Sequence, residues 1–329
     1  MKLLLLGGTG TISSGVTAVA RQRGIELYIL TRRQRAICDE VPADVKQLVA
    51  DYTDDESTIK ALGDLHFDCV IDFIINRCGG IERATRIWQG RTDQYIYISS
   101  ASAYYKPLPS PFVTEETPLG NPYWEYSRNK IRSEEELRRA IDKGFPGVIV
   151  RPSLTYSDFR LLTSFTPKNS SWGIFSRMLE GKPLPVQGDG LSLWTITHCT
   201  DFAKGILGLA GNRAAIGEAF HITSDEVLTW NQIYECLGAA VGVAKPNLYH
   251  VACDRIIEYN PKYAGILLGD HANSVIFDNS KIKRFVPDFK CEIPFAVGAK
   301  RIADWYRAHP EAQIGDPEWE KEMDAICKL

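Results

Sequence analysis

Short apolar runs alternate with longer amphipathic stretches along the first half of the chain. This pattern predicts strands separated by helices, because a strand covered on both faces is apolar throughout whereas a helix is apolar along one stripe. Strands that alternate with helices favour an α/β fold with a doubly wound parallel sheet. Strands are expected at residues 3–6, 26–31, 45–49, 68–75, 94–99 and 147–150, and helices at 12–23 and 123–142.

The stretch 105–122 is rich in proline and is expected to form a loop, because proline cannot donate to a ladder. In the helix that follows, the pairs Glu134/Arg138 and Glu135/Arg139 stand four residues apart, a spacing typical of a solvated face.

The pattern becomes irregular and richer in glycine and proline after Arg151-Pro152. We therefore predict a first domain over residues 1–155 and a smaller C-terminal lobe, mainly over 156–329. A segment at about 191–223 is expected to return to the first domain.

The composition limits the possible partners. The chain has 329 residues, 44% of them hydrophobic and 24% charged, and its formal net charge is −3. These values are typical of a soluble globular protein and argue against nucleic acid or a membrane as the main partner. The opening apolar run is too short for a signal peptide and no run reaches the roughly 18 residues of a membrane span, so a cytoplasmic protein is expected. None of the eight cysteines forms a C-x-x-C pair, and no metal site is predicted.

A glycine-rich turn follows the first strand and opens the first helix: Gly7-Gly8-Thr9-Gly10-Thr11-Ile12-Ser13. Glycines at this position let the backbone approach a pyrophosphate, and the helix N-terminus supplies N–H donors. The spacing is G-x-x-G-x-x-S, with a small serine where a third glycine often stands. The turn predicts a Rossmann-type site for NAD or NADP.

The end of the second strand favours NADP over NAD. An acidic residue there would hold the ribose 2′-hydroxyl of NAD, but the strand ends in Thr31-Arg32-Arg33. Guanidinium groups bind phosphate bidentately and suit the 2′-phosphate of NADP, although arginines after a strand are also common surface residues. Asp51, after the third strand, is a candidate either for the adenine amino group or for a helix cap.

Three residues are candidates for the chemistry: Ser100 at the end of the fifth strand, and Tyr126 and Lys130 one helical turn apart. A phenol has a pKa of about 10 in water, and a nearby ammonium is expected to lower it. Tyr126 would then exchange a proton with a substrate hydroxyl while hydride moves to or from nicotinamide, and Ser100 would hold the substrate oxygen. Y-x-x-x-K also occurs by chance in helices, so the assignment depends on the accompanying glycine turn.

Together these motifs resemble the extended short-chain dehydrogenase/reductase superfamily in its NAD-dependent epimerase/dehydratase branch. The resemblance covers nearly the whole chain. It implies a homodimer, catalytic Ser100, Tyr126 and Lys130, and a cofactor held by Gly7, Gly10, Thr11, Ile12, Asp51, Tyr52, Phe73, Ile74, Lys130 and Pro152.

The chain departs from the family pattern in three ways. The arginine expected after Gly188-Asp189-Gly190 is replaced by Trp194, and Leu267-Leu268 stand where a second arginine would precede Gly269-Asp270. Both arginines hold a substrate diphosphate in the family, so their loss argues against a nucleotide sugar. Trp194 either stacks on an uncharged ring or packs in the core, and Ser102 is a second candidate for substrate contact. The segment 73–100 is also short and lacks the asparagine-containing helix of epimerases, as in relatives of plastid stem-loop RNA-binding proteins.

Three functions therefore stay open. The first is an epimerase or dehydratase acting on a sugar-like polyol through a keto intermediate. The second is an NADPH-dependent carbonyl reductase or alcohol dehydrogenase. The third is a non-catalytic dinucleotide- or RNA-binding module, against which Ser100, Tyr126 and Lys130 argue.

Overall fold

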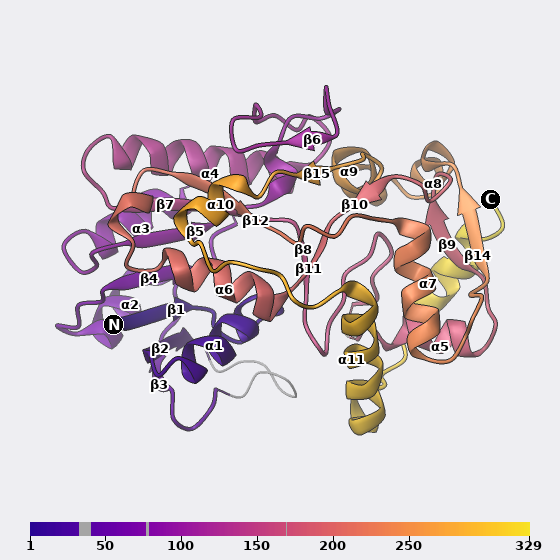
Figure 1. The fold of residues 1–329 in the computed structure, drawn as a ribbon, viewed down its shortest axis with the longest axis horizontal. Helices are drawn as coiled ribbons and strands as arrows, with labels where there is room; N and C mark the ends of the chain where they lie inside the picture. Colours follow the sequence, from indigo (N-terminus) through magenta and orange to yellow (C-terminus); the bar gives the residue numbers. More distant parts are fainter. Residues whose placement is uncertain (33–40, 77–78, 169) are drawn as a thin grey trace.

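A parallel sheet lies in one half of the molecule (Figure 1). The structure, a computed structural model, describes residues 1–32, 41–76, 79–168 and 170–329. The strands of this sheet are β1 (Lys2–Leu6), β2 (Glu26–Thr31), β3 (Lys46–Val49), β4 (Cys69–Asp72), β5 (Tyr95–Ile98), β7 (Gly147–Pro152) and β12 (Ala219–Ile222). Within the described residues their order is β12-β7-β5-β4-β1-β2-β3, and all neighbours pair in parallel.

Helices cover both faces of the sheet. Successive side chains of a strand point to opposite faces. Leu3 and Leu5 therefore join one core and Leu4 and Leu6 another, and all four are fully buried. Residues of α1 (Ser13–Gln22), α6 (Cys199–Leu209) and α10 (Ser280–Phe285) pack in the first core, and those of α2 (Asp55–Leu62), α3 (Gly80–Trp88) and α4 (Glu125–Ile141) in the second. The predicted doubly wound sheet is confirmed.

A third core fills the other half of the molecule, where α5, α7, α8 and the C-terminus lie (Figure 1). Its helices include α5 (Trp172–Leu179), α7 (Trp230–Ala240), α8 (Cys253–Tyr259), α9 (Ala264–Ile266), α11 (Phe295–Ala308) and α12 (Pro317–Ile326). Four short strand pairs complete the described fold: β6 (Phe112–Val113) with β15 (Ile276–Phe277), β8 (Leu154–Tyr156) with β11 (Ile196–His198), β9 (Leu184–Gln187) with β14 (Leu248–Val251), and β10 (Leu193–Trp194) with β13 (Leu228–Thr229). No helix within the described residues has the length and apolar character needed to cross a membrane.

The fourth strand is shorter than the apolar run 68–75 predicts. β4 ends at Asp72, whose carboxylate accepts hydrogen bonds from the backbone N–H groups of Ile74 (2.8 Å) and Ile75 (3.1 Å). This side chain competes with the ladder for the backbone and turns the chain. The segment after it forms α3, which contains no asparagine.

The loop predicted at 105–122 contains the short strand β6. Its partner, β15, is more than 150 positions further along the chain, so local sequence carries no signal for it.

The expectation of a fully solvated face on α4 is wrong for Glu134. Its side chain is 1% exposed and forms an ion pair with Arg151 on β7, with 2.7 Å between Oε2 and Nη2. The Ser99 hydroxyl also donates to Glu134, at 2.5 Å. The i,i+4 spacing points to Arg138 as the partner of Glu134. Arg151 lies beside α4 only once the chain has folded, so the spacing could not indicate it.

Candidate functional site

A cavity of about 1320 Å³ opens at the carboxyl ends of β1 and β4 and extends to the third core. The chain runs from β1 toward β2 and β3 on one side and toward β5 and β7 on the other, so the cavity lies where the strand order reverses. Ligands of open α/β sheets bind at such switch points. The cavity is lined by every predicted site residue except Arg33, which lies outside the described residues.

The glycine turn is held in place by the hydroxyls of α1. Gly7 has φ of +81°, a left-handed conformation that favours glycine. The Ser13 hydroxyl accepts from Gly10 N (2.9 Å) and donates to Gly7 O (2.5 Å), and the Thr17 hydroxyl donates to Gly8 O (2.7 Å). Ser13 therefore closes the turn by hydrogen bonding, in addition to being small.

The turn fits a dinucleotide. A Cβ on Gly7 would lie 3.1 Å from Ile74 Cγ1, and one on Gly8 would lie 2.6 Å from Ile29 Cδ1, so the glycines allow a close approach of backbone. The N-terminus of α1 has no side-chain cap, which leaves donors available for a pyrophosphate. Gly7, Gly10, Thr11 and Ile12 line the cavity at this point.

Residues after β2 and β3 form the opposite end of the cofactor half. Thr31, Arg32 and Asp51 line the cavity. Asp51 is exposed, and its pKa is lowered by hydrogen bonds from the hydroxyl and N–H of Thr53 and by the charge of Arg32. Tyr52 also borders the cavity, but it is 3% exposed and its hydroxyl accepts from Trp88 Nε1 at 3.1 Å. Its side chain therefore belongs mainly to the core.

Ser100 begins a short 3-10 turn, Ala101–Ala103. Its hydroxyl lies 2.9 Å from the Ser102 hydroxyl and accepts from Ser102 N at 3.2 Å. Ser127 on α4 donates to the Ser102 hydroxyl at 2.8 Å. Ser102 is 2% exposed, so its main contact is with Ser100 and α4 and it positions Ser100 rather than presenting a free hydroxyl.

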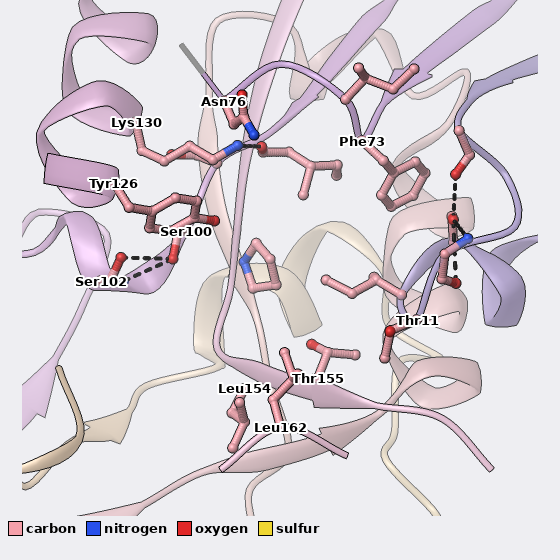
Figure 2. A pocket seen from close by; sticks show the side chains of 18 of the residues that line it. Thr11, Phe73, Asn76, Ser100, Ser102, Tyr126, Lys130, Leu154, Thr155 and Leu162 are labelled. Atoms are coloured by element: carbon pink, nitrogen blue, oxygen red, sulfur yellow. Dashed lines mark hydrogen bonds between the residues drawn. The ribbon is translucent and has the colours of Figure 1, made fainter. Parts of the chain in front are cut away.

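Tyr126 and Ser100 lie side by side, with Lys130 from the same helix next to Tyr126 and Thr11 across the cavity (Figure 2). Lys130 is 4% exposed and donates to Ile75 O and Ile98 O, both at 2.7 Å. Its Nζ lies 5.8 Å from the centre of the Tyr126 ring. The carbonyls of Ile75, in the loop after β4, and of Ile98, the last residue of β5, thus fix the ammonium beside the phenol.

The electrostatics of the pair differ from the expectation. Burial raises the pKa of Tyr126 to about 12, with a hydrogen bond to Ser100 opposing and the charge of Asp270 adding to the rise. Burial lowers the pKa of Lys130 to about 8, against the charges of Asp72 and Glu134. Lys130 is not among the groups that shift this pKa, so the nearby ammonium does not offset the desolvation of the phenol.

The remaining predicted residues lie around this pair. Phe73, Ile74 and Pro152 border the cavity between the glycine turn and Tyr126. Trp194 is 2% exposed, and its ring centre lies 5.7 Å from that of Trp230 and 4.9 Å from that of His271. Trp194 is therefore packed in the third core, which favours the second of its two interpretations over stacking on a substrate.

Three charged residues at the cavity were not predicted as site residues: Lys106, Asp270 and Lys262. The first two lie in separate segments. Lys106 follows the 3-10 turn, and Asp270 lies in a π-helical turn, Leu267–His271. In the sequence, Gly269-Asp270 is notable only because the arginine of the family pattern is absent before it. The proximity of Lys106 and Asp270 depends on contacts between segments more than 150 residues apart, and no local motif marks it. Among the described residues, no group of three or more histidine, cysteine or acidic side chains is arranged to hold a metal ion.

Comparison with known proteins agrees with this geometry. The family model described as the NAD dependent epimerase/dehydratase family matches residues 3–223. The chain is 26% identical over 275 residues to the chloroplast stem-loop binding protein of 41 kDa b from Arabidopsis thaliana, which covers 79% of this chain but only 66%, slightly under two thirds, of that protein. It is 24% identical over 243 residues to 2'-dehydrokanamycin reductase from Streptomyces kanamyceticus. This match covers 74% of this chain and 67% of the reductase.

Two solved structures share the fold. One is dTDP-glucose 4,6-dehydratase from Bacillus anthracis in complex with NAD, with a TM-score of 0.75, 18% identity, and 94% and 98% of the two chains covered. The other is UDP-glucose 4-epimerase from Thermotoga maritima with UDP-glucose, with a TM-score of 0.73, 16% identity, and 94% and 99% covered. The chain therefore belongs to the NAD-dependent epimerase/dehydratase family.

Proposed function

We propose that this enzyme transfers hydride at a secondary alcohol carbon of a sugar-like polyol, forming the keto intermediate of an epimerase or dehydratase cycle. The observation that carries the proposal is the pairing of Ser100 with Tyr126 in the cavity that also contains the glycine turn. A proton-transfer group beside a cofactor site is the minimum that alcohol–ketone interconversion requires.

Each of the three residues has a separate role in this proposal. In the oxidation step Tyr126 acts as the phenolate and its Oη takes the proton of the substrate hydroxyl; in the reduction step the neutral phenol returns that proton to the substrate oxygen. Ser100 donates a hydrogen bond to the same substrate oxygen, and Ser102 orients Ser100. The Lys130 ammonium, fixed by two carbonyls, stabilises the phenolate when it forms and is positioned to contact the nicotinamide ribose. When bound, the cofactor supplies reversible acceptance of hydride from the carbon.

NADP is the proposed cofactor. Arg32 lines the cavity after β2, and no acidic residue ends that strand to hold a ribose 2′-hydroxyl. The family as such is NAD-dependent, and the proposal therefore predicts a difference in affinity that can be measured.

The proposed substrate lacks a nucleotide diphosphate. Leu267 and Trp194, which lie near the positions of the two missing arginines, are buried at 0% and 2% exposure. The elements after residue 155 would bind this substrate as a lobe, with 191–223 counted in the first domain. The proposal includes the homodimer and cytoplasmic location expected from the sequence.

A simple carbonyl reductase that uses NADPH is the second candidate. The likeness to 2'-dehydrokanamycin reductase favours it, as does Arg32. The two candidates share Ser100, Tyr126 and Lys130 and differ in whether the cofactor is released after each turnover.

The retained cofactor separates the two candidates. The purified protein is denatured and its supernatant assayed for NAD(H) and NADP(H). An epimerase or dehydratase is expected to carry close to one equivalent, because it regenerates its cofactor within the cycle. A protein that emerges empty and oxidises added NADPH with a panel of keto sugars is the reductase.

Tyr126→Phe tests the chemistry that both candidates share. We expect turnover to fall by about 10²- to 10⁴-fold, the usual effect of removing a general acid–base, while cofactor binding is retained. Tyr249→Phe is the matched control, because Tyr249 is 40% exposed on β14 and does not line the cavity. If Tyr126→Phe turns over any identified substrate at the wild-type rate, the proposed function is wrong; RNA binding without turnover would instead favour the third hypothesis.

A further inference from the structure

Lys106 and Asp270 line the substrate half of the cavity as a pair of opposite charges. Lys106 is 2% exposed and the side chain of Asp270 is 15% exposed. Within the part of the chain that the structure describes, no protein hydrogen bond is found to Lys106 Nζ or to the Asp270 carboxylate, and neither group is among the fully enclosed unpaired atoms, so both face the cavity. The contact of Asp270 Oδ2 with His271 Nε2 is 3.9 Å long, and burial lowers the pKa of that imidazole to about 3, so the ring is neutral.

Burying charged groups without hydrogen bonds is costly, and such groups concentrate at functional sites. Lys106 and Asp270 are close enough for each charge to oppose the effect of burial on the pKa of the other. Their mutual attraction offsets part of the cost but leaves the N–H donors and the carboxylate oxygens without partners. A ligand that supplies those partners would gain hydrogen bonds that the protein has not made.

The surrounding structure holds Asp270 near the reacting groups. Asn121, 3% exposed, donates from Nδ2 to Ser102 O at 2.8 Å and to Gly269 O at 2.7 Å. It therefore ties the turn that carries Ser100 to the turn that carries Asp270. A Cβ on Gly269 would lie 3.0 Å from Asn121 Oδ1 and from Trp124 Cβ, so this glycine allows the two turns to approach closely.

Lys106, Asp270 and the phenol of Tyr126 line the same cavity. The charge of Asp270 also adds to the raised pKa of Tyr126. A substrate carbon held at Tyr126 and Ser100 therefore brings its neighbouring substituents within the region of Asp270 and Lys106.

We propose that Asp270 and Lys106 form a polar clamp for a neutral polyhydroxylated ring, in which Asp270 accepts a hydrogen bond from one hydroxyl and Lys106 donates to the oxygen of another near the reacting carbon. The clamp specifies the substrate class for the proposed function, and this inference rests on that function. One donor and one acceptor of opposite charge match vicinal hydroxyls, since a hydroxyl both donates and accepts.

Charged substrates match the clamp less well. A diphosphate placed between the two groups is repelled by Asp270 whenever its carboxyl is ionised, and a cationic amine is repelled by Lys106. Lys262 also lines the cavity, but its Nζ is already 2.6 Å from Glu322 Oε1. It therefore supplies no free cation for a diphosphate.

The test measures binding rather than turnover, so that its failure is distinct from a failure of hydride transfer. Protein saturated with NADPH is titrated with a panel of neutral methyl pyranosides and inositols, a methyl aminopyranoside and UDP-glucose, by calorimetry or ligand-observed NMR. We expect a neutral member to bind most tightly. Asp270→Asn and Lys106→Met are each expected to weaken that binding by about tenfold or more, because each loses a hydrogen bond to a charged group.

Lys262→Met is the matched control, a cavity-lining lysine that has its own partner, and it is expected to leave the affinity unchanged. NADPH affinity and circular dichroism report whether each variant is folded. If one clamp variant fails to fold, the other variant tests the proposal. Competition between the pyranoside and UDP-glucose for the wild-type protein tests it independently. Tighter binding of UDP-glucose or of the amine, no binding of any neutral member, or unchanged affinity in the clamp variants overturns the proposal.

Discussion

At the scale of single residues, the site depends on buried charges that backbone carbonyls and neighbouring side chains hold in place. Lys130 is fixed by Ile75 O and Ile98 O rather than by an acidic side chain. Its carbonyl partners lie at the end of β5 and in the loop just after the adjacent strand β4, so the ammonium is positioned by the sheet itself. The side chain of Tyr126 is 37% exposed and borders the cavity, and the desolvation of its phenol raises its pKa, so the phenol is protonated near neutral pH.

Asp270 should make stability depend on pH. Burial raises the pKa of its carboxyl to about 7, against the charge of Lys106 and above the roughly 3.9 of an unfolded chain. The folded state therefore binds this proton more tightly, and the resulting stabilisation is complete below about pH 4 and is lost as the pH rises through about 7. His271 and Tyr126, which also face the carboxyl, are neutral over this range.

We expect the free energy of unfolding of wild type, relative to that of Asp270→Asn, to decrease between pH 4 and pH 8. Urea titrations of both proteins across this range measure the difference. A difference that stays level or increases with pH would mean that Asp270 is not held protonated by burial.

At the scale of elements, the position of the cofactor turn depends on how closely α1 and α6 pack. Gly15 lies on the buried face of α1, and a Cβ there would overlap the backbone carbonyl group of Cys199 at the start of α6. Backbone atoms at a helix start cannot move aside without shifting the helix. The approach of the two helices therefore sets where α1, and with it the glycine turn, meets the sheet.

Gly15→Ala is expected to destabilise the protein by about 1–3 kcal/mol, the usual cost of overpacking. The same substitution in an uncrowded helix interior stabilises by about 0.5–1 kcal/mol, so the expected sign is opposite to helix propensity. Thermal and urea denaturation measure it. Gly315→Ala is the control, because a Cβ on Gly315 would meet no heavy atom within 4 Å. If the Gly15→Ala protein is as stable as wild type, α6 must shift to accommodate the added methyl group.

At the scale of the whole molecule, the cavity joins the two halves. Its walls come from the sheet domain, through the glycine turn, Ser100 and Tyr126, and from the third core, through Tyr263 and Asp270. A ligand bound there contacts both halves and stabilises the folded state by mass action.

NADPH is therefore expected to raise the unfolding temperature more than NADH at the same concentration. Saturation at about 100 times the Kd contributes about 2.7 kcal/mol. Arg32→Ala should reduce the shift given by NADPH and leave that given by NADH, because a guanidinium on the 2′-phosphate serves only NADP. Differential scanning fluorimetry measures both. A larger shift with NADH on the wild-type protein would reject the NADP preference.

The sequence by itself determined the parallel sheet, the glycine turn and the pairing of Tyr126 with Lys130 on one helix face. These features depend on local periodicity, on glycine backbone freedom and on the i,i+4 geometry of one helix, all of which a linear pattern records. The tertiary structure decided the features that depend on distant contacts: the burial of Glu134 against Arg151, the packing of Trp194 in the core, and the raised pKa of Tyr126. It also decided the meeting of Lys106 with Asp270, because a pairing between residues 164 positions apart is created only when the chain folds.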